Sequence, residues 1–207
     1  MIVKLIVSSL FVFSTSSART LVEPKIEILR GEANLVLGAD VTKALKLYDA
    51  GFSLLRNNQF RAPVVSLFND KAQEVPMALV DDFNADNVKD IVLLGTTEKD
   101  GKPKVKAILF VSHKDHYKPF LVEWWASDRY LNWVETRSGA KEIRDWHMYF
   151  KILHESEKRI LKSGGLLKIP KATKGFKVMN HYGSGHPYYF KKGKVFTFSK
   201  TPPKGGL

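Results

Sequence analysis

Short apolar segments, bounded by turn-forming residues, recur along most of this 207-residue chain. They run for four to eight residues and are rich in β-branched and aromatic side chains, which is typical of strands. Between two of them, the segment 98–103 contains Asp-Gly and proline and is expected to be a turn that joins two strands. The segments predicted to be strands are 25–29, 63–68, 76–80, 91–94, 105–112, 119–123, 166–169, 176–179, 187–190 and 195–198.

These segments predict a mainly β fold, with an α+β arrangement left open. We expect antiparallel sheets accompanied by one or two short helices. One helix is predicted at 40–48, where Asp40 can cap the first turn and apolar side chains recur on one face. Segment 128–161 mixes apolar and polar residues, and both a helix and an irregular aromatic-rich structure remain open there. A hairpin is predicted at 188–196, with Gly193 supplying the positive φ of its tight turn.

The N-terminus has the three parts of an export signal. Lys4 precedes an apolar stretch at 5–13, and small residues stand at Ser16 and Ala18, so residues 1–18 are predicted to be a cleavable signal peptide. The apolar stretch falls well short of the roughly 20 residues that a helix needs to cross a bilayer. We therefore expect a periplasmic or secreted protein with no transmembrane segment in the mature chain.

The remainder of the chain is expected to form one domain. No linker divides it, so 19–200 is predicted to be a single β-rich domain and 201–207 a disordered tail. The chain contains no cysteine, which excludes disulfides, catalytic thiols and thiolate metal sites. A domain of this length can bury a sufficient core without such cross-links.

Positive charge is concentrated at the C-terminal end. Residues 151–207 contain 13 Lys/Arg and 2 acids and so carry +11 of the net charge of +12. This asymmetry favours a surface that attracts polyanions, and the alternative is a solvated face that maintains solubility. The export signal argues against intracellular nucleic acid and favours an anionic envelope polymer or lipid head groups as the partner. The residues predicted to bind it are Lys168, Lys171, Lys174, Lys177, Lys191, Lys192 and Lys194.

One short segment has the residue spacing of a calcium loop. Side chains with oxygen atoms recur at Asp82, Asn84, Asp86 and Asp90, and a tight loop can direct them at one centre together with the backbone carbonyl of Val88. Calcium takes six to eight oxygen ligands, and carboxylates this close together repel one another without a cation. The alternative is a metal-free turn between strands, held by hydrogen bonds of its Asp and Asn side chains.

The run from Asp82 to Val92 resembles the calcium loop of FG-GAP/VCBS repeats, in which an Asp-Phe-Asn-Gly-Asp-Gly segment leads into an aspartate and an apolar strand. Ala85 and Asn87 stand where the family has glycines, and asparagine tolerates a left-handed backbone better than alanine does. The family repeats its loop around a β-propeller, whereas this chain has one copy, so a complete propeller is not expected. The order of signal, loop, β-rich body and aromatic hairpin is also similar to that of bacterial envelope proteins. The resemblance implies calcium ligands at Asp82, Asn84, Asp86, Asp90 and the Val88 carbonyl.

Two functions are compatible with these features. The first is an exported, non-enzymatic binding or structural module with a calcium-type loop and a basic C-terminal face for an anionic envelope component. The second is a metal-assisted envelope hydrolase acting on a polysaccharide or phosphoester, with the three loop aspartates organising the metal. We expect the tryptophans of the run Glu123-Trp124-Trp125, together with Trp133 and Trp146, to be packing residues, and the alternative is a platform on which a sugar stacks. The run 183–186, Gly-Ser-Gly-His, is expected to be a flexible loop between strands, and the alternative is a serine nucleophile beside a base.

Overall fold

Over the described residues the protein is mainly β, its sheets are antiparallel, and no barrel or propeller closes, which confirms the predicted fold class. The predicted signal peptide 1–18, the predicted strand 166–169 and the predicted tail 201–207 lie outside the described residues. The structure, a computed structural model, describes residues 20–30, 32–68, 74–99, 102–125, 132–135, 141–154, 174–180 and 182–197.

The first sheet has five strands, and its centre is buried on both faces. The side chains of 91–94 and 107–110 are fully buried, which explains why these segments are continuously apolar instead of alternating. β5 pairs with β4 through its first half and with β3 through its second, and β6 and β7 follow in order. The five strands are β3 (Ser53–Leu54), β4 (Ala78–Asp81), β5 (Asp90–Lys99), β6 (Lys102–His113) and β7 (His116–Trp125).

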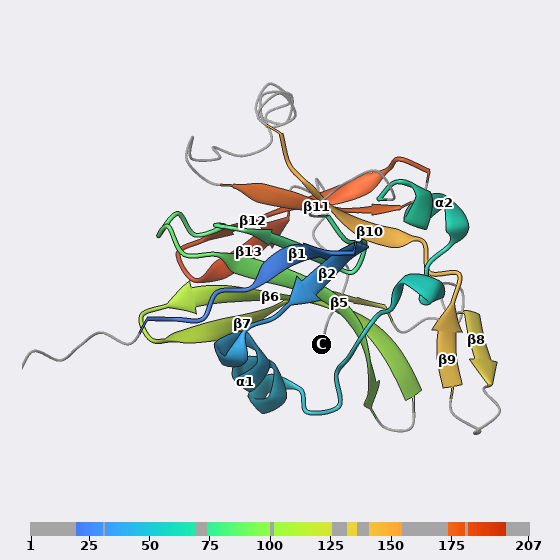
Figure 1. Ribbon diagram of the computed structural model, residues 1–207, viewed down its shortest axis with the longest axis horizontal. Coiled ribbons are helices and arrows are strands. Elements are labelled where there is room, and N and C mark those ends of the chain that lie inside the picture. Colours follow the sequence, from blue (N-terminus) through green and yellow to red (C-terminus); the bar gives the residue numbers. More distant parts are fainter. Residues whose placement is uncertain are drawn as a thin grey trace, which may run out of the picture.

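The second sheet has four strands in chain order and lies over one face of the first (Figure 1). Aromatic pairs join the two sheets: the ring centroids of Phe83 and Phe176 are 5.2 Å apart, and those of Phe120 and Phe190 are 5.0 Å apart. The predicted hairpin is confirmed, and Gly193 has the positive φ expected of its turn, 73°. The four strands are β10 (Met148–Ile152), β11 (Gly175–Asn180), β12 (Gly185–Lys191) and β13 (Lys194–Thr197).

The predicted short helix is α1 (Ala39–Tyr48), which packs against β7. Its first residue is preceded by Gly38 as the N-cap, so the predicted capping role of Asp40 is wrong. The Asp40 carboxylate is instead buried and accepts a hydrogen bond from the backbone N–H of Val22, 2.9 Å away. A hairpin of β1 (Lys25–Leu29) and β2 (Glu32–Val36) crosses in front of the sheets in Figure 1.

Two sequence predictions are wrong. The segment 63–68 is helical at α2 (Ala62–Ser66), because Pro63 suits a first helical turn and a short apolar run does not by itself distinguish a strand from a buried helix. Within 128–161, the described residues form strands instead of a helix. Besides β10, they form a hairpin of β8 (Asn132–Glu135) and β9 (Lys141–Arg144). Earlier in the chain, a short 3-10 helix, η1 (Asn57–Gln59), precedes α2.

One hydrophobic core fills the space between the two sheets and continues under α1 and α2. The prediction that tryptophans pack is confirmed for Trp146 and Trp125, which are 0% and 8% exposed, whereas Trp124 is 47% exposed. In the part of the chain that is described, no helix has both the length and the apolar character needed to cross a membrane.

Candidate functional site

The predicted calcium loop connects β4 to β5 and is wound around the side chain of Asp82. One oxygen of this carboxylate accepts hydrogen bonds from the N–H groups of Ala85 (2.7 Å) and Asp86 (3.2 Å), and the other accepts from that of Asn87 (3.0 Å). This winding places Ala85 and Asn87 in the left-handed region, with φ of 64° and 67°. These are the two positions where the FG-GAP/VCBS repeats have glycines, so the backbone of the loop matches the conformation that glycine favours.

Asp90, the first residue of β5, anchors the loop from inside the protein. Its side chain is 0% exposed, and its carboxylate accepts hydrogen bonds from the N–H groups of Phe83 (2.7 Å), Asn84 (3.2 Å) and Ser112 (2.8 Å). Burial raises the pKa of the Asp90 carboxyl to about 6, against the opposing effect of the hydrogen bonds from Ser112 and Phe83. Asp90 therefore has three backbone donors, which only partly offset the effect of its burial on the charged form.

Asp86 and Asn84 close the loop against β6. One Asp86 oxygen accepts from the Ser112 hydroxyl (2.7 Å) and the Asn84 Nδ2 (2.8 Å), and the other accepts from the N–H of Val88 (2.9 Å). Burial works to raise the pKa of Asp86, but the hydrogen bonds from Ser112 and Val88 outweigh it, and the pKa lies below its ordinary value. The Asn84 amide also donates to the backbone carbonyl of Ser112, 3.1 Å away.

The oxygens of this loop do not form a calcium shell in the observed arrangement. A carboxylate offers about four acceptor positions, and three are already occupied by protein donors on each of Asp82, Asp86 and Asp90. Among the residues whose placement is described, no three His, Asp or Glu side chains are grouped so that they could hold a metal. Calcium binding therefore stays a prediction, and it requires these carboxylates and the Asn84 amide to exchange hydrogen bonds for the ion.

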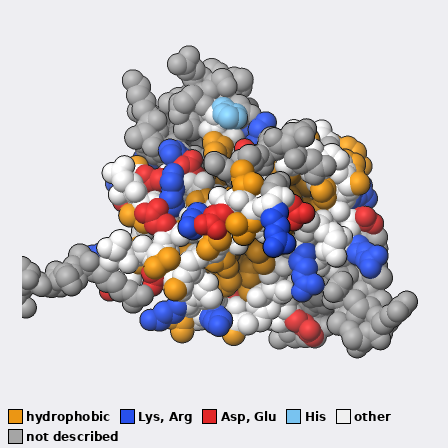
Figure 2. Space-filling view, viewed as in Figure 1, with side chains coloured by type: hydrophobic (Ala, Val, Ile, Leu, Met, Phe, Trp, Pro, Cys, Tyr) orange, Lys and Arg blue, Asp and Glu red, His pale blue; other side chains and the backbone are white. Residues whose placement is uncertain are grey.

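The described C-terminal lysines do not all lie on one face of the protein. Lys174 forms an ion pair with Asp81, with Nζ 2.6 Å from the carboxylate, and so belongs to the region beside the loop. The register of β11 to β13 places Lys177, Lys191 and Lys194 on the face of the second sheet that points away from the first. On the face drawn in Figure 2, basic and acidic side chains alternate, so no single basic patch forms there. Lys168 and Lys171 lie outside the described residues.

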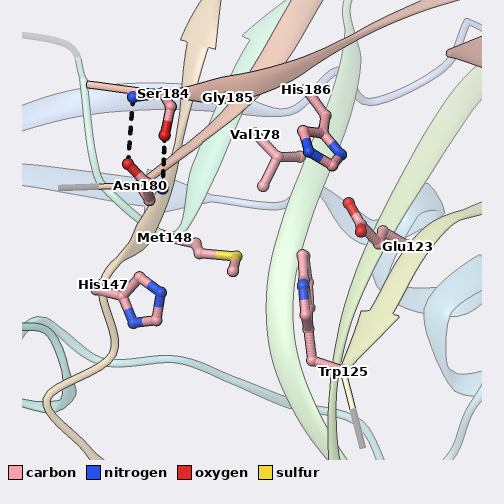
Figure 3. A pocket seen from close by; sticks show the side chains of 9 residues that line it. All are labelled: Glu123, Trp125, His147, Met148, Val178, Asn180, Ser184, Gly185 and His186. Carbon is pink, nitrogen blue, oxygen red and sulfur yellow. Dashed lines mark hydrogen bonds between the residues drawn. The ribbon is translucent and has the colours of Figure 1, made fainter. Parts of the chain in front are cut away.

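At the end of the two sheets away from the 82–90 loop, a pocket of about 560 Å³ opens between β7 and the second sheet (Figure 3). Its lining comes from one strand of the first sheet and three strands of the second, so residues far apart in the sequence meet there. The apolar part consists of Trp125, Met148 and Val178. The polar part consists of Glu123, His147, Asn180, Ser184 and His186, with the backbone of Gly185 between the last two.

A β-bulge directs the two β7 residues into this pocket. Leu109 pairs with Phe120 and Ala107 pairs with Glu123, so β7 contains one residue more than β6 over this stretch. Without that extra residue, the alternation of the strand would place Phe120 and Glu123 on opposite faces. With it, both face the second sheet, where Phe120 contacts Phe190 and Glu123 contacts Tyr188. Bulges commonly redirect side chains beside functional sites.

A turn between β11 and β12 forms the opposite wall, and the Asn180 side chain holds it. The amide oxygen of Asn180 accepts from the N–H groups of Tyr182 (3.0 Å) and Ser184 (3.2 Å), and its nitrogen donates to the Ser184 hydroxyl (2.9 Å). The backbone adds hydrogen bonds from Asn180 to Ser184 (2.8 Å) and from Gly183 to Asn180 (3.1 Å). These hydrogen bonds hold the described residues of the wall, 180 and 182–184, to one another.

Two further features of the pocket are the Glu123 carboxylate, which accepts a hydrogen bond from Tyr188, and the aromatic ring of Trp125. The Tyr188 hydroxyl donates to one oxygen of Glu123, and burial, followed by this hydrogen bond, raises the pKa of Tyr188 above its ordinary value. The ring of Trp125 packs edge-on against that of Trp146, with centroids 5.3 Å apart. The Trp146 Nε1 is the one buried side-chain nitrogen or oxygen in the described structure with no hydrogen-bond partner.

The sequence contained the parts of this pocket but not their combination. Glu123 and Trp125 stand out as an acidic and aromatic run, and His186 stands out beside a Gly-Ser-Gly run, yet neither run predicts that the other is its neighbour. The bulge in β7 and the exposure of His186 and Ser184 are visible only in the structure. No pattern in the sequence indicates His147.

A second hollow lies beside α1, with a volume of about 640 Å³. Its lining comes entirely from 36–47, and the Thr42 hydroxyl within it already donates to the backbone carbonyl of Gly38 at 2.8 Å. It brings together no side chains from distant parts of the chain, and so the pocket between the sheets is the stronger candidate site. Comparison with family models, with curated proteins and with solved structures gives no match for this chain.

Proposed function

We propose that the protein is an exported, non-enzymatic binding module whose ligand site is the pocket between the sheets. The observation that carries the proposal is the convergence of Glu123, Trp125 and His186 on one preformed pocket of about 560 Å³. Small-molecule sites typically measure about 300–1,000 Å³ and combine an apolar lining with a few placed polar groups. The export part of the proposal is supported by residues 1–18 of the sequence.

The hydrogen bonds of the pocket favour binding over catalysis. The Ser184 hydroxyl is held by the amide nitrogen of Asn180, which cannot remove its proton as a catalytic base would. Glu123 accepts a hydrogen bond from Tyr188. A rigid wall and a polar rim lower the entropic cost of binding, which is an advantage for a binding site in particular.

A fragment screen by NMR tests the proposal. We expect soluble fragments, whatever their charge, to cluster on the pocket and to shift the signals of His186 and the Trp125 indole in a saturable way. His113, an exposed histidine at the opposite end of β6, serves as the internal reference and should not shift. Fragments that bind only beside α1, or that bind nowhere, would contradict the proposal.

The second candidate function is adhesion to an anionic envelope polymer or to lipid head groups through the β12–β13 hairpin. Lys191 lies directly opposite Lys194, and Lys192 forms the turn between them with a φ of 48°. Like charges opposite each other in a sheet are destabilising, and a polyanion would relieve that repulsion. No described acidic side chain forms an ion pair with these three lysines.

Retention on heparin and on anionic vesicles tests this adhesion. The double variant with Lys191 and Lys194 changed to glutamate should elute at lower salt than the wild type, because fewer counterions are released on binding. The matched control changes Lys43 and Lys46, which are exposed on α1, to glutamate. Equal losses in both variants would show that net charge alone is responsible, and binding to only one of the two matrices would identify the class of partner.

A further inference from the structure

The pocket combines an apolar floor with a polar rim, and this restricts what it can bind. Trp125, Met148 and Val178 supply the apolar surface, and Glu123, Ser184 and His186 supply polar groups around it. A wholly apolar ligand would leave the Glu123 carboxylate without water, which is costly. The ligand must therefore have both apolar C–H surface and hydroxyl-type hydrogen-bonding groups.

The charge of the lining is the second restriction. Although the chain carries a net charge of +12, none of the described residues that line the pocket is a lysine or arginine, and the one carboxylate among them is Glu123. An anionic ligand would meet that carboxylate with no described lysine or arginine to pair with. A cationic ligand would have to approach through the field of a strongly basic protein. The lining therefore favours an uncharged ligand.

The hydrogen-bonding capacity of the rim is the third restriction. One Glu123 oxygen is used by Tyr188, and the other remains an acceptor in the described structure. The Ser184 hydroxyl accepts from Asn180 and keeps its own proton to donate. The exposed His186 ring lies beside Glu123 in Figure 3 and can donate through one nitrogen and accept through the other. Such a mixture of donors and acceptors suits hydroxyl groups, which both donate and accept.

We infer that the pocket binds an uncharged carbohydrate, with the C–H surface of a sugar ring against Trp125, Met148 and Val178 and its hydroxyl groups on Glu123, Ser184 and His186. This inference rests on the proposed binding function and adds the chemical class of the ligand. Glu123 accepts from one or more hydroxyls, and the turn held by Asn180 positions Ser184 and His186. The basic β12–β13 hairpin takes no part in this recognition.

Three matched sugars test the inference on the full mature chain: methyl β-glucopyranoside, which is uncharged, glucuronate, which is anionic, and glucosamine, which is cationic. Titration is followed by calorimetry and by the NMR signals of the Trp125 indole and His186. We expect the uncharged glucoside to bind most tightly of the three and to shift both signals. Tighter binding of glucuronate or glucosamine, or no binding of any of the three, would overturn the inference.

Variants that preserve the fold locate the binding. Glu123→Gln keeps an acceptor for Tyr188 but loses the carboxylate, and it should weaken glucoside binding about tenfold or more. His186→Ala should weaken it as well, whereas His113→Ala should leave it unchanged. Unchanged binding in Glu123→Gln and His186→Ala would place the sugar elsewhere and overturn the inference. If fragments occupy the pocket but none of the three sugars binds, the ligand class is wrong while the binding function stands. If neither fragments nor sugars bind, both fail.

Discussion

The polar groups at the two ends of the space between the sheets differ in how many hydrogen bonds they form with the protein itself. At the loop end, Asp82, Asp86 and Asp90 each accept three hydrogen bonds from the protein itself, and Phe83 and the Asp81–Lys174 ion pair tie the loop to the second sheet. At the pocket end, the Tyr188 hydroxyl donates a hydrogen bond across the sheets to Glu123, beside an open volume of about 560 Å³. Polar groups that are satisfied internally support a fold, and polar groups that face open space are available for a ligand.

The sequence resemblance indicates a binding site at the loop, where calcium binding stays a prediction, whereas the structure adds a pocket at the other end of the sheets. The acidic spacing at Asp82, Asn84, Asp86 and Asp90 is conspicuous in the sequence, yet the structure uses it to hold a strained loop together. The pocket residues come from short runs that are far apart along the chain, so no single run indicates the pocket. The comparison therefore predicts that loop variants affect stability most strongly and that pocket variants affect binding most strongly.

The largest effect is expected from Asp90→Ala. The change removes a fully buried carboxylate and leaves the N–H groups of Phe83, Asn84 and Ser112 without an acceptor. Each buried orphan group costs about 1–3 kcal/mol, so unfolding should become easier by roughly 3–5 kcal/mol in urea titrations. His186→Ala at the pocket should change stability by less than about 0.5 kcal/mol. Equal effects of the two variants would remove the distinction between the two ends.

The second largest effect is expected from the pH dependence of the stability that Asp90 contributes. Because the native pKa of Asp90 is raised to about 6 from an ordinary 3.8, the native state holds a proton between these values that the unfolded chain releases. The stability that Asp90 contributes is therefore full below about pH 4 and is lost as the pH rises through 6, an effect on the order of 3 kcal/mol. The difference in unfolding free energy between the wild type and Asp90→Asn, obtained from melting curves at each pH, isolates this contribution of Asp90. A difference that stays constant from pH 4 to 7 would show that Asp90 remains ionised throughout.

The effect of calcium on stability tests whether the loop end also binds a ligand. If calcium displaces the internal hydrogen bonds, at about ten times its Kd it should stabilise the protein by about 1.4 kcal/mol, because it binds only the native state. Asp86→Ala should abolish that gain, while Glu123→Gln at the pocket should retain it. Identical melting curves in calcium and in EDTA, with no heat on titration, would leave the loop as a metal-free turn.

The smallest effect is expected from Ala85→Gly. Ala85 has a φ of 64°, where a side chain is unfavourable and glycine is not. The loss of strain should exceed the extra entropy that glycine gives the unfolded chain, for a net stabilisation of about 0.5–1 kcal/mol. Asn87→Gly, at a φ of 67°, should gain less because asparagine tolerates this region. A loss of stability in Ala85→Gly would show that the alanine side chain supports the loop.

The sequence predicted most of the strands because their composition and bounding turns are local signals. β1 matches its prediction at both ends, and β5 to β7 contain their predicted segments. Pro63 and its apolar neighbours were assigned to the wrong element because a run of that length carries no clear period. The site was harder to predict, since it depends on the insertion of one residue in β7 and on the packing of β7 against strands of the other sheet. Neither leaves a pattern in a single sequence.

The division between a structural end and a binding end can be tested in a crystal structure of the protein without residues 1–18, grown with methyl β-glucopyranoside. We expect the sugar in the pocket between the sheets, in contact with Trp125 and within hydrogen-bond distance of Glu123, while the hydrogen bonds around Asp90 stay unchanged. A sugar bound at the 82–90 loop or on the β12–β13 hairpin, with the pocket holding only water, would contradict the division of the molecule into a structural end and a binding end.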